Sequence, residues 1–471
     1  MHSLPFSVVR LGRTNRSRTG DAEDQSQSTE ATHDRSTSSL QGLFQLSEIQ
    51  VRQYPDASSY CRFLEICFEP LLAAEYDTVW SFVRNNRRPS LAVECWPLFD
   101  IICATIRTMD KGSSIEDVCA ALCTPTPGDN RPGLLGAPAR DPCFVAIFSI
   151  LCWTTMTLQP KLHWPDFQGS PSLMVHSQAS GQESLRIEWV KRPIPALFRH
   201  FHRTMRTSCW RHPIGESKTD RSIALELSCL NYESLSGIAK ISLVWVSDLT
   251  SHLDFDVTRR QLSIFRFPSF CALSTAVKNE AQSIPILEEL VRELYGTTAD
   301  AARESHDRAQ LHREILMSYR LLFGQRRGSR QLAKVALKTL KDKEGDKYDD
   351  LLDLLCTHRC DSKIRSLPVS LWPVTCRTFE GDLQEENSYS SQDDFPLFGQ
   401  RLVKLQEFTL RQQPSKLGDL WRDKRNPLQW YTFWAVLIVG GASILIGLLQ
   451  LFIGTAQLVV TLFPQNSGCR C

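Results

Sequence analysis

The C-terminal end of the chain contains a long apolar run that limits how the whole protein can be arranged. In the 471-residue sequence no charged side chain occurs between Arg425 and Arg470. The 34 residues from Trp430 to Phe463 would form a helix roughly 51 Å long. The hydrocarbon core of a bilayer is ~30 Å thick, so two spans would not fit and one tilted span does. We therefore expect a single transmembrane helix over residues 430–463.

Aromatic and basic residues at the start of this run predict its orientation. The expected membrane-interface anchors are Arg422, Lys424, Arg425, Trp430, Tyr431 and Trp434. Aromatic side chains favour the headgroup level, and Lys and Arg are enriched on the cytosolic side. We expect the N-terminal region to be cytosolic and the protein to be tail-anchored, in a membrane that the sequence does not identify. The lipid bilayer is then its first partner.

Small and polar residues interrupt the apolar run at alternating spacings of three and four. They are Gly440, Ser443, Gly447, Gln450, Gly454, Gln457 and Thr461. This spacing is typical of a helix face that packs against another helix. In lipid, small residues permit close backbone approach, and a Gln amide hydrogen bond contributes ~0.6–2 kcal/mol. We predict that the face pairs with a second copy or with a different membrane helix. The alternative is that the glycines and glutamines have no partner and the transmembrane helix is only marginally apolar.

Composition excludes some classes of protein. The formal net charge of +2 lacks the basic bias of a nucleic-acid-binding protein, so we expect no nucleic-acid partner. The 16 cysteines are irregularly spaced, and no apolar secretory signal precedes them. We therefore expect reduced thiols in a cytosol-facing region.

Hydrophobic periodicity predicts a mainly α (α+β) fold with a small antiparallel sheet. Apolar residues recur at helical spacing from Phe63 to Leu71 and from Val93 to Cys103. The run Cys143–Leu158 is apolar on all sides and too short to cross a bilayer, so we expect a buried core helix. A further amphipathic helix is expected over about 300–323.

Alternating patterns mark the expected strands. They occur in Ser184–Lys191 and Ser222–Cys229, and His252–Phe267 has the pattern of a hairpin with a polar turn. The expected order of regions is a disordered arm (1–42), a helical region (43–160), a mixed region with the sheet (161–275), a helical region (276–380), an acidic linker (381–394), a juxtamembrane helical segment (395–429), the transmembrane helix (430–463) and a short tail (464–471).

Two groups of residues have the ligand types of a metal site. The first set is His200, His202, Cys209 and His212. Imidazole and thiolate are the ligands that zinc favours, but the spacing matches no known zinc motif and four arginines surround it, so a solvated basic surface is the default interpretation. In the second, Asp254 and Asp256 share one side of an expected strand and would hold a divalent cation; carboxylates at a hairpin turn are the commoner case.

Two further short segments have ordinary interpretations beside the functional ones. Cys356–Cys360 places two thiols one helical turn apart, which favours a helix end with one buried cysteine. Phe323–Arg330 is a basic, glycine-containing segment that would meet phosphate or anionic lipid, or would simply be a solvated loop. The fate of Cys469 and Cys471 depends on which side of the membrane the tail occupies.

Two stretches carry a resemblance to a known group of proteins. They are "ISLVWVSDLTSHLDFDVTRRQLSIFRFPSFCAL" (241–273) and "LRQQPSKLGDLWRDKRNPLQWYTFWAVLIVGGASILIGLLQL" (410–451). With the intervening "LLFGQ" (321–325), they resemble uncharacterised filamentous-fungal proteins that end in a "PLQWYTFWAVL"-type membrane helix. The resemblance covers the C-terminal half and implies a common organisation and a fungal source. It implies no activity.

The function expected from these features is a membrane-anchored scaffold or interaction protein that self-associates through its transmembrane helix. The P-loop, dinucleotide, HExxH, GxSxG and kinase motifs do not occur in the sequence, so we expect neither a catalytic residue nor a cofactor. Two alternatives remain: a membrane-tethered, metal-dependent transferase using Asp254 and Asp256, and an accessory subunit of a larger membrane complex.

Overall fold

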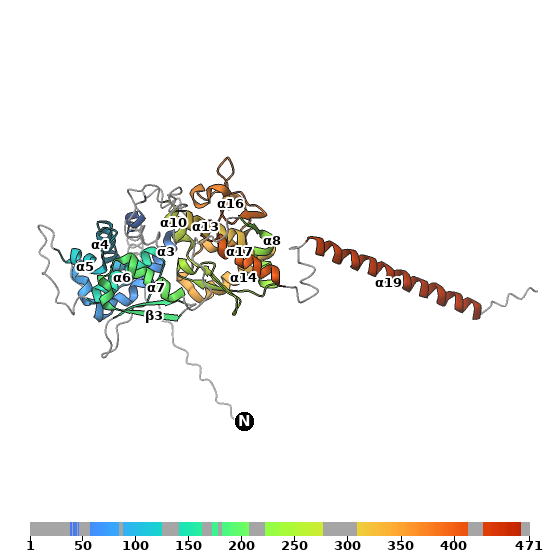
Figure 1. Ribbon diagram of the computed structural model, residues 1–471, viewed down its shortest axis with the longest axis horizontal. Helices are drawn as coiled ribbons and strands as arrows, with labels where there is room; N and C mark the ends of the chain where they lie inside the picture. Colours follow the sequence, from blue (N-terminus) through green and yellow to red (C-terminus); the bar gives the residue numbers. More distant parts are fainter. Residues whose placement is uncertain are drawn as a thin grey trace, which may run out of the picture.

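A helical body and a separate C-terminal helix make up the chain, which is described as a computed structural model (Figure 1). The described residues are 38–39, 41–44, 46, 57–83, 88–124, 141–162, 172–177, 181–206, 222–276, 309–412 and 427–462. The predicted mainly helical fold with small sheets and one apolar C-terminal helix is confirmed. Most of the predicted arm at 1–42, the tail at 464–471 and the segment 277–308 lie outside these residues.

The helices follow the predicted apolar periodicity closely. In chain order they are α3 (Ala57–Phe68), α4 (Trp96–Arg107), α5 (Ile115–Cys123), α6 (Asp141–Thr155), α7 (Ile194–Arg206), α8 (Leu227–Leu230), α9 (Tyr232–Gly237), α10 (Pro268–Ala276), α13 (Gln310–Tyr319), α14 (Arg327–Glu344), α15 (Leu351–Thr357), α16 (Ser362–Arg365), α17 (Gly399–Arg411) and α19 (Pro427–Leu462). One turn of π-helix, η8 (Arg320–Gly324), continues α13.

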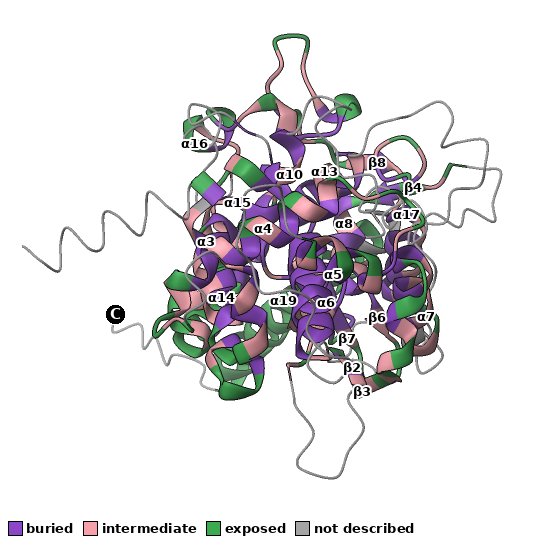
Figure 2. Cartoon of the chain, turned by 90° about the vertical axis from the view of Figure 1, so that its left-hand side faces the viewer, coloured by how far each residue is buried: buried purple, intermediate pink, exposed green. Residues whose placement is uncertain are grey.

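The predicted core helix is the centre of the N-terminal half. Every residue of α6 from Pro142 to Thr155 is buried, as expected for a helix that is apolar on all sides (Figure 2). The Tyr60 hydroxyl of α3 donates to the carbonyl of Trp153 at 2.9 Å. Phe68 packs edge-on against Trp153 and Trp96, which joins α3, α4 and α6. The buried apolar cluster runs on from here to Leu405 in α17.

Within the described ranges, three small sheets accompany the helices. The strands are β1 (Gln159–Pro160), β2 (Ser172–Ser177), β3 (Gly181–Arg186), β4 (Ala224–Glu226), β5 (Ser242–Val246), β6 (Phe255–Asp256), β7 (Gln261–Phe265) and β8 (Ser388–Ser390). The predicted hairpin is confirmed as β6 and β7, which pair antiparallel. The same sheet also contains β5, which pairs parallel to β7. The sheet is therefore mixed. Its central strand is β7, which lies between β5 and β6.

Two predicted strands are shorter than their alternating patterns. In Ser184–Lys191 the strand ends at Arg186, opposite Ser172, the first residue of its partner β2. The rest, Ile187–Lys191, is a 3₁₀ helix. In Ser222–Cys229 only β4 is extended, and α8 starts at Leu227. Alternation alone does not reveal where the partner strand stops.

The segment 381–394, expected from its composition to be an acidic linker, contributes to the folded body. Its strand β8 pairs antiparallel with β4. Tyr389 of β8 is buried, and its ring packs edge-on against that of Phe395. Glu385 forms an ion pair with Arg320 at 2.6 Å. The polar side chains that favoured a solvated connector are partly used for contacts inside the molecule.

Helix α17 starts against the backbone of this segment. A Cβ atom on Gly399, the first residue of α17, would overlap the carbonyl oxygen of Ser391. Backbone atoms cannot move aside as a flexible side chain can, so only glycine permits this approach.

We predict that Gly399→Ala lowers the free energy of unfolding by about 1–3 kcal/mol, the usual cost of inserting a methyl group into a packed site. Urea unfolding of the full chain in detergent measures the change. The matched control is Gly112→Ala, because a Cβ at Gly112 meets open space. Equal effects of the two substitutions would contradict the prediction.

Candidate functional site

The C-terminal helix α19 has the composition and length of a membrane span. Tyr431–Val459 is 29 residues long, and none of its most apolar window is buried against the body. Such a helix exceeds the ~30 Å hydrocarbon core, so tilt or an interfacial extension accommodates the excess. One helix of this kind is present in the described part of the chain. The predicted apolar C-terminal helix is confirmed, and its candidate span Tyr431–Val459 lies within the predicted range 430–463.

The predicted helix–helix face lies on one side of α19. At 100° per residue, its members fall within an arc of roughly 100°, and they are Gly440, Ser443, Gly447, Gln450, Gly454, Gln457 and Thr461. A Cβ on any of the three glycines would meet open space. The hydroxyls of Ser443 and Thr461 donate to carbonyls of their own helix, at 2.9 and 2.7 Å.

Two side chains on this face still have hydrogen-bonding capacity. Within the described residues, neither the amide of Gln450 nor that of Gln457 forms a hydrogen bond. An unsatisfied amide is costly in hydrocarbon, which favours a partner helix that would bind it. Whether this face pairs with another helix stays a prediction.

The predicted interface anchors are only partly described. Tyr431 is exposed, and Trp434 is half-buried with its ring 6.2 Å from that of Phe433. Trp430 belongs to α19, but its side chain lies outside the described set, as do the basic anchors Arg422, Lys424 and Arg425.

The two aspartates proposed as metal ligands have separate structural roles. Asp254 is buried, and its carboxylate lies 3.4 Å from the Arg401 guanidinium. The Asp256 carboxylate accepts the backbone N–H groups of Thr258 and Arg259, each at 2.9 Å, and so closes the hairpin turn. The described part of the chain contains no group of three His, Cys, Asp or Glu residues able to hold a metal ion.

The histidine candidates are separated by helix geometry. His200 and His202 are two residues apart on α7, and residues with this spacing do not face each other. The ring of His200 packs on Trp189 with centroids 4.4 Å apart, while His202 is buried. The other two predicted ligands, Cys209 and His212, lie outside the described residues.

Cys356–Cys360 is a helix end with one buried cysteine, as in its ordinary interpretation, whereas Phe323–Arg330 is mostly helical and is not a solvated loop. α15 ends at Thr357, with Cys356 fully buried and Cys360 half-buried. All 13 cysteines in the described ranges are free thiols. The basic segment Phe323–Arg330 forms the junction between η8 and α14.

A buried polar cluster around α13 was not predicted. Its central pair is His252 and Ser318, both fully buried, with His252 Nε2 2.8 Å from Ser318 Oγ. Because Nδ1 accepts the backbone N–H of Phe265 at 3.1 Å, the ring proton is on Nε2 and points to the serine. Burial and the nearby Arg401 hold the pKa of His252 well below its usual range. The histidine is thus a donor to Ser318 and not a base that would activate it.

Glu314, one turn before Ser318, holds the start of α17. Its carboxyl oxygens accept the backbone N–H of Phe398 at 2.9 Å and that of Leu397 at 3.0 Å. Gln310 donates to it at 3.2 Å. Burial raises the pKa of Glu314 to about 8, although these hydrogen bonds oppose the shift.

Arg320 in η8 is also fully buried. It donates through Nε and Nη2 to one carboxylate oxygen of Glu385, at 2.8 and 2.6 Å. Its Nη1 donates to the carbonyls of Leu355 and His358, at 2.6 and 2.8 Å. A Cβ on Gly324 would overlap this guanidinium, so the π-turn needs glycine there. All these polar groups bind protein atoms.

One signal for this cluster was present in the sequence. Glu314 and Ser318 lie at i+3 and i+7 from Leu311, on the edge of the apolar face predicted for this helix. A residue on such an edge can be buried or exposed, and the pattern does not identify the partner of Glu314, which lies about 80 residues away.

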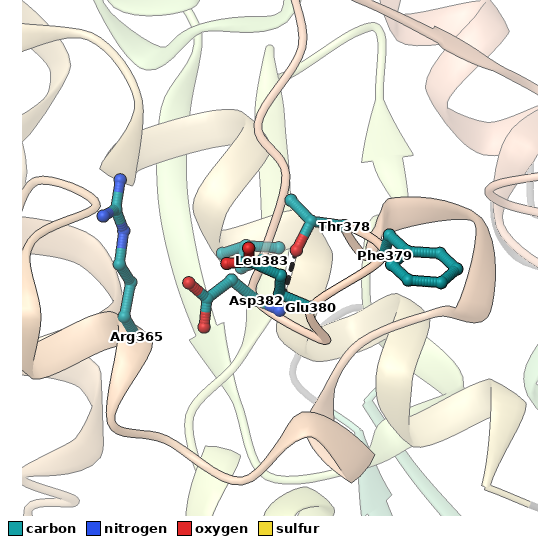
Figure 3. A pocket seen from close by; sticks show the side chains of 6 residues that line it. All are labelled: Arg365, Thr378, Phe379, Glu380, Asp382 and Leu383. Atoms are coloured by element: carbon teal, nitrogen blue, oxygen red, sulfur yellow. Dashed lines mark hydrogen bonds between the residues drawn. The ribbon is translucent and has the colours of Figure 1, made fainter.

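A surface hollow lies beside the hairpin that follows the 3₁₀ turn at Val374–Cys376 (Figure 3). Its lining residues are Arg365, Thr378, Phe379, Glu380, Asp382 and Leu383. The Thr378 hydroxyl accepts the Asp382 N–H at 3.0 Å, and the fully exposed Phe379 ring points away from Arg365. The hollow is open, and it contains no nucleophile paired with a base.

Comparison with known protein families, curated protein sequences and solved structures finds no match. The resemblance to the filamentous-fungal group therefore stays a prediction. The described geometry offers α19 as the functional element with the clearest chemistry.

The raised pKa of Glu314 gives a pH prediction. The folded pKa of about 8 exceeds the unfolded reference of 4.5, so the folded state binds the proton more tightly. Its contribution to stability is present below pH 4.5 and is lost as the pH rises through 8. Glu314→Gln keeps an acceptor for α17 and never ionises.

We expect Glu314→Gln to reduce the fall in Tm between these two pH values. Thermal unfolding in detergent across the pH range measures it, with the exposed Glu188→Gln as control. A fall in Tm as steep as in the unaltered chain would show that Glu314 does not titrate in this window.

Proposed function

We propose that this protein is a single-pass, tail-anchored membrane protein whose folded body lies on the cytosolic side and acts as a scaffold. The observation that carries the proposal is the span Tyr431–Val459, which is long and apolar enough to cross a bilayer and is not covered by the body. An exposed apolar helix of this length is stable in lipid and not in water.

The chemistry of the body supports a role in binding over a role in catalysis. In the described residues, the buried His252, Glu314 and Arg320 all have intramolecular partners that fix neighbouring segments. Catalytic groups of an enzyme usually converge on a concave, accessible site. The transferase alternative is weakened because Asp254 is paired with Arg401 and Asp256 closes a turn.

We further propose that α19 self-associates through its Gly/Gln face, defined by the seven residues from Gly440 to Thr461 given above. Open space at the glycines and the two uncommitted Gln amides support close packing of a second helix. The accessory-subunit alternative uses the same face with a different protein as partner.

The anchoring is tested by extraction of membranes with alkaline carbonate. We expect the full chain to stay in the membrane pellet and a variant lacking 427–462 to be released. A deletion of similar length cannot be made in the body without unfolding it, so the control is a chain in which an unrelated transmembrane helix replaces α19. Release of the full chain by carbonate would refute the anchoring.

The self-association is tested with Gln450→Leu combined with Gln457→Leu. Loss of two interhelical amide bonds should lower the dimerisation constant, measured as crosslinked dimer in membranes, by about eightfold to several hundredfold, on the scale of ~0.6–2 kcal/mol per bond. The matched control is Leu445→Ile with Phe452→Leu, on the opposite side of α19. An unchanged amount of dimer would refute self-association through the Gly/Gln face. Crosslinks to other proteins alone would favour the accessory subunit.

A further inference from the structure

The outer face of α14 carries an unusual concentration of positive charge. Residues 326–344 contain seven Lys or Arg and two acidic residues, a net charge of +5, whereas the whole chain has a formal net charge of +2. The rest of the protein is therefore slightly acidic. A local excess of this size is a property of this helix and not of the composition.

The charges form one stripe along the helix. At 100° per residue, Arg327, Lys334, Lys338 and Lys341 fall within roughly 60° of one another. All four side chains are exposed, as is Arg326 just before the helix. Lys341 pairs with Asp350 at 2.9 Å. For Arg326, Arg327, Lys334 and Lys338, no ion pair is formed within the described residues.

One apolar side chain lies beside the stripe. Val335 is 68% exposed, and at 100° per residue it lies roughly 60° from the nearest stripe residue, whereas Leu332 lies roughly 120° away. The opposite side of the helix is committed to the body, because Ala333, Leu337 and Leu340 are buried and α14 packs against α9, α15 and η8. The exposed surface thus combines several cations with one neighbouring apolar side chain, Val335, and the packed side holds it in place.

We propose that this surface, the α14 cationic face, docks the body on an anionic lipid bilayer. Lys and Arg near a membrane are attracted to phosphatidylserine and related headgroups, and the neighbouring Val335 would enter the headgroup layer. This inference rests on the anchoring proposed above. It names the second contact that the protein makes with the same membrane.

The arrangement of the chain favours a lipid surface over a nucleic acid or an acidic protein. Fourteen residues separate Gln412, just after α17, from Pro427 at the start of α19. Even fully extended they would span only roughly 50 Å, so an anchored body stays close to the headgroups. In Figure 1, α14 lies in the same half of the body as α17, and Figure 2 shows the two helices on different sides of that half. A membrane is therefore the anionic surface at the highest local concentration.

The test uses the full chain reconstituted in vesicles of phosphatidylcholine alone or of phosphatidylcholine with phosphatidylserine. Acetylation of individual lysines is measured by mass spectrometry. We expect the reactivity of Lys334 and Lys338 to fall by at least about threefold when phosphatidylserine is present, and to recover in high salt. Lys111 and Lys191, exposed elsewhere on the body, should not respond.

Charge reversal provides the matched pair of variants. Arg326→Glu with Arg327→Glu should abolish the protection of the two reporter lysines. It should not unfold α14, because acidic residues are favourable at a helix N-terminus. The control is Arg186→Glu with Arg359→Glu, two exposed arginines on other elements, which should keep the protection.

The outcomes separate this inference from the anchoring. Carbonate-resistant protein whose Lys334 and Lys338 react equally in both vesicle types overturns the docking and leaves the anchoring intact. Protein that carbonate releases overturns the anchoring itself. Protection by RNA in the absence of vesicles, with none by phosphatidylserine, would assign the face to nucleic acid and overturn the lipid proposal.

Discussion

The carboxyl group of Glu314 is the contact on which the C-terminal part of the body depends. It binds the two backbone N–H groups that precede α17 and so fixes where the last helix of the body begins. In the first turn of α17, Arg401 donates to the carbonyls of Thr250 and His252 and forms an ion pair with Asp254. The helix that leads toward α19 is therefore attached through polar bonds as well as apolar packing.

Burying a charged side chain costs free energy unless hydrogen bonds and an opposite charge compensate for the lost water. The guanidinium of Arg320 meets this condition with a carboxylate and two carbonyls in a π-turn whose glycine leaves room for it. A hydrophobic residue at such a position is often as stabilising as the ion pair. Arg320 binds both Glu385 and the carbonyls at the end of α15. These bonds fix the path of the segment 381–394, whose composition is that of a polar connector.

These bonds also bear on function. A His–Ser pair, a buried glutamic acid and a buried arginine would each attract interest in an active site. Here the imidazole proton points to the serine, the carboxyl group binds backbone N–H groups, and the guanidinium donates four hydrogen bonds to protein oxygens. The chemistry left for partners is at the surface, on the Gly/Gln face of α19 and the cationic face of α14. Both fit a protein that works at a membrane.

The apolar C-terminal helix, the buried helix α6 and the hairpin β6–β7 could be predicted from local patterns, because each is encoded in a run of residues whose apolar period or length indicates one structure. The same patterns did not locate the partner of Glu314 or of Arg320, the end of β3 or the role of Asp254. The partners of Glu314, Arg320 and Asp254 lie 65 to about 150 positions away, and β3 ends opposite Ser172, the first residue of its partner strand. Only the tertiary structure decides such contacts, since a buried polar group needs a partner but its own neighbourhood does not specify which one.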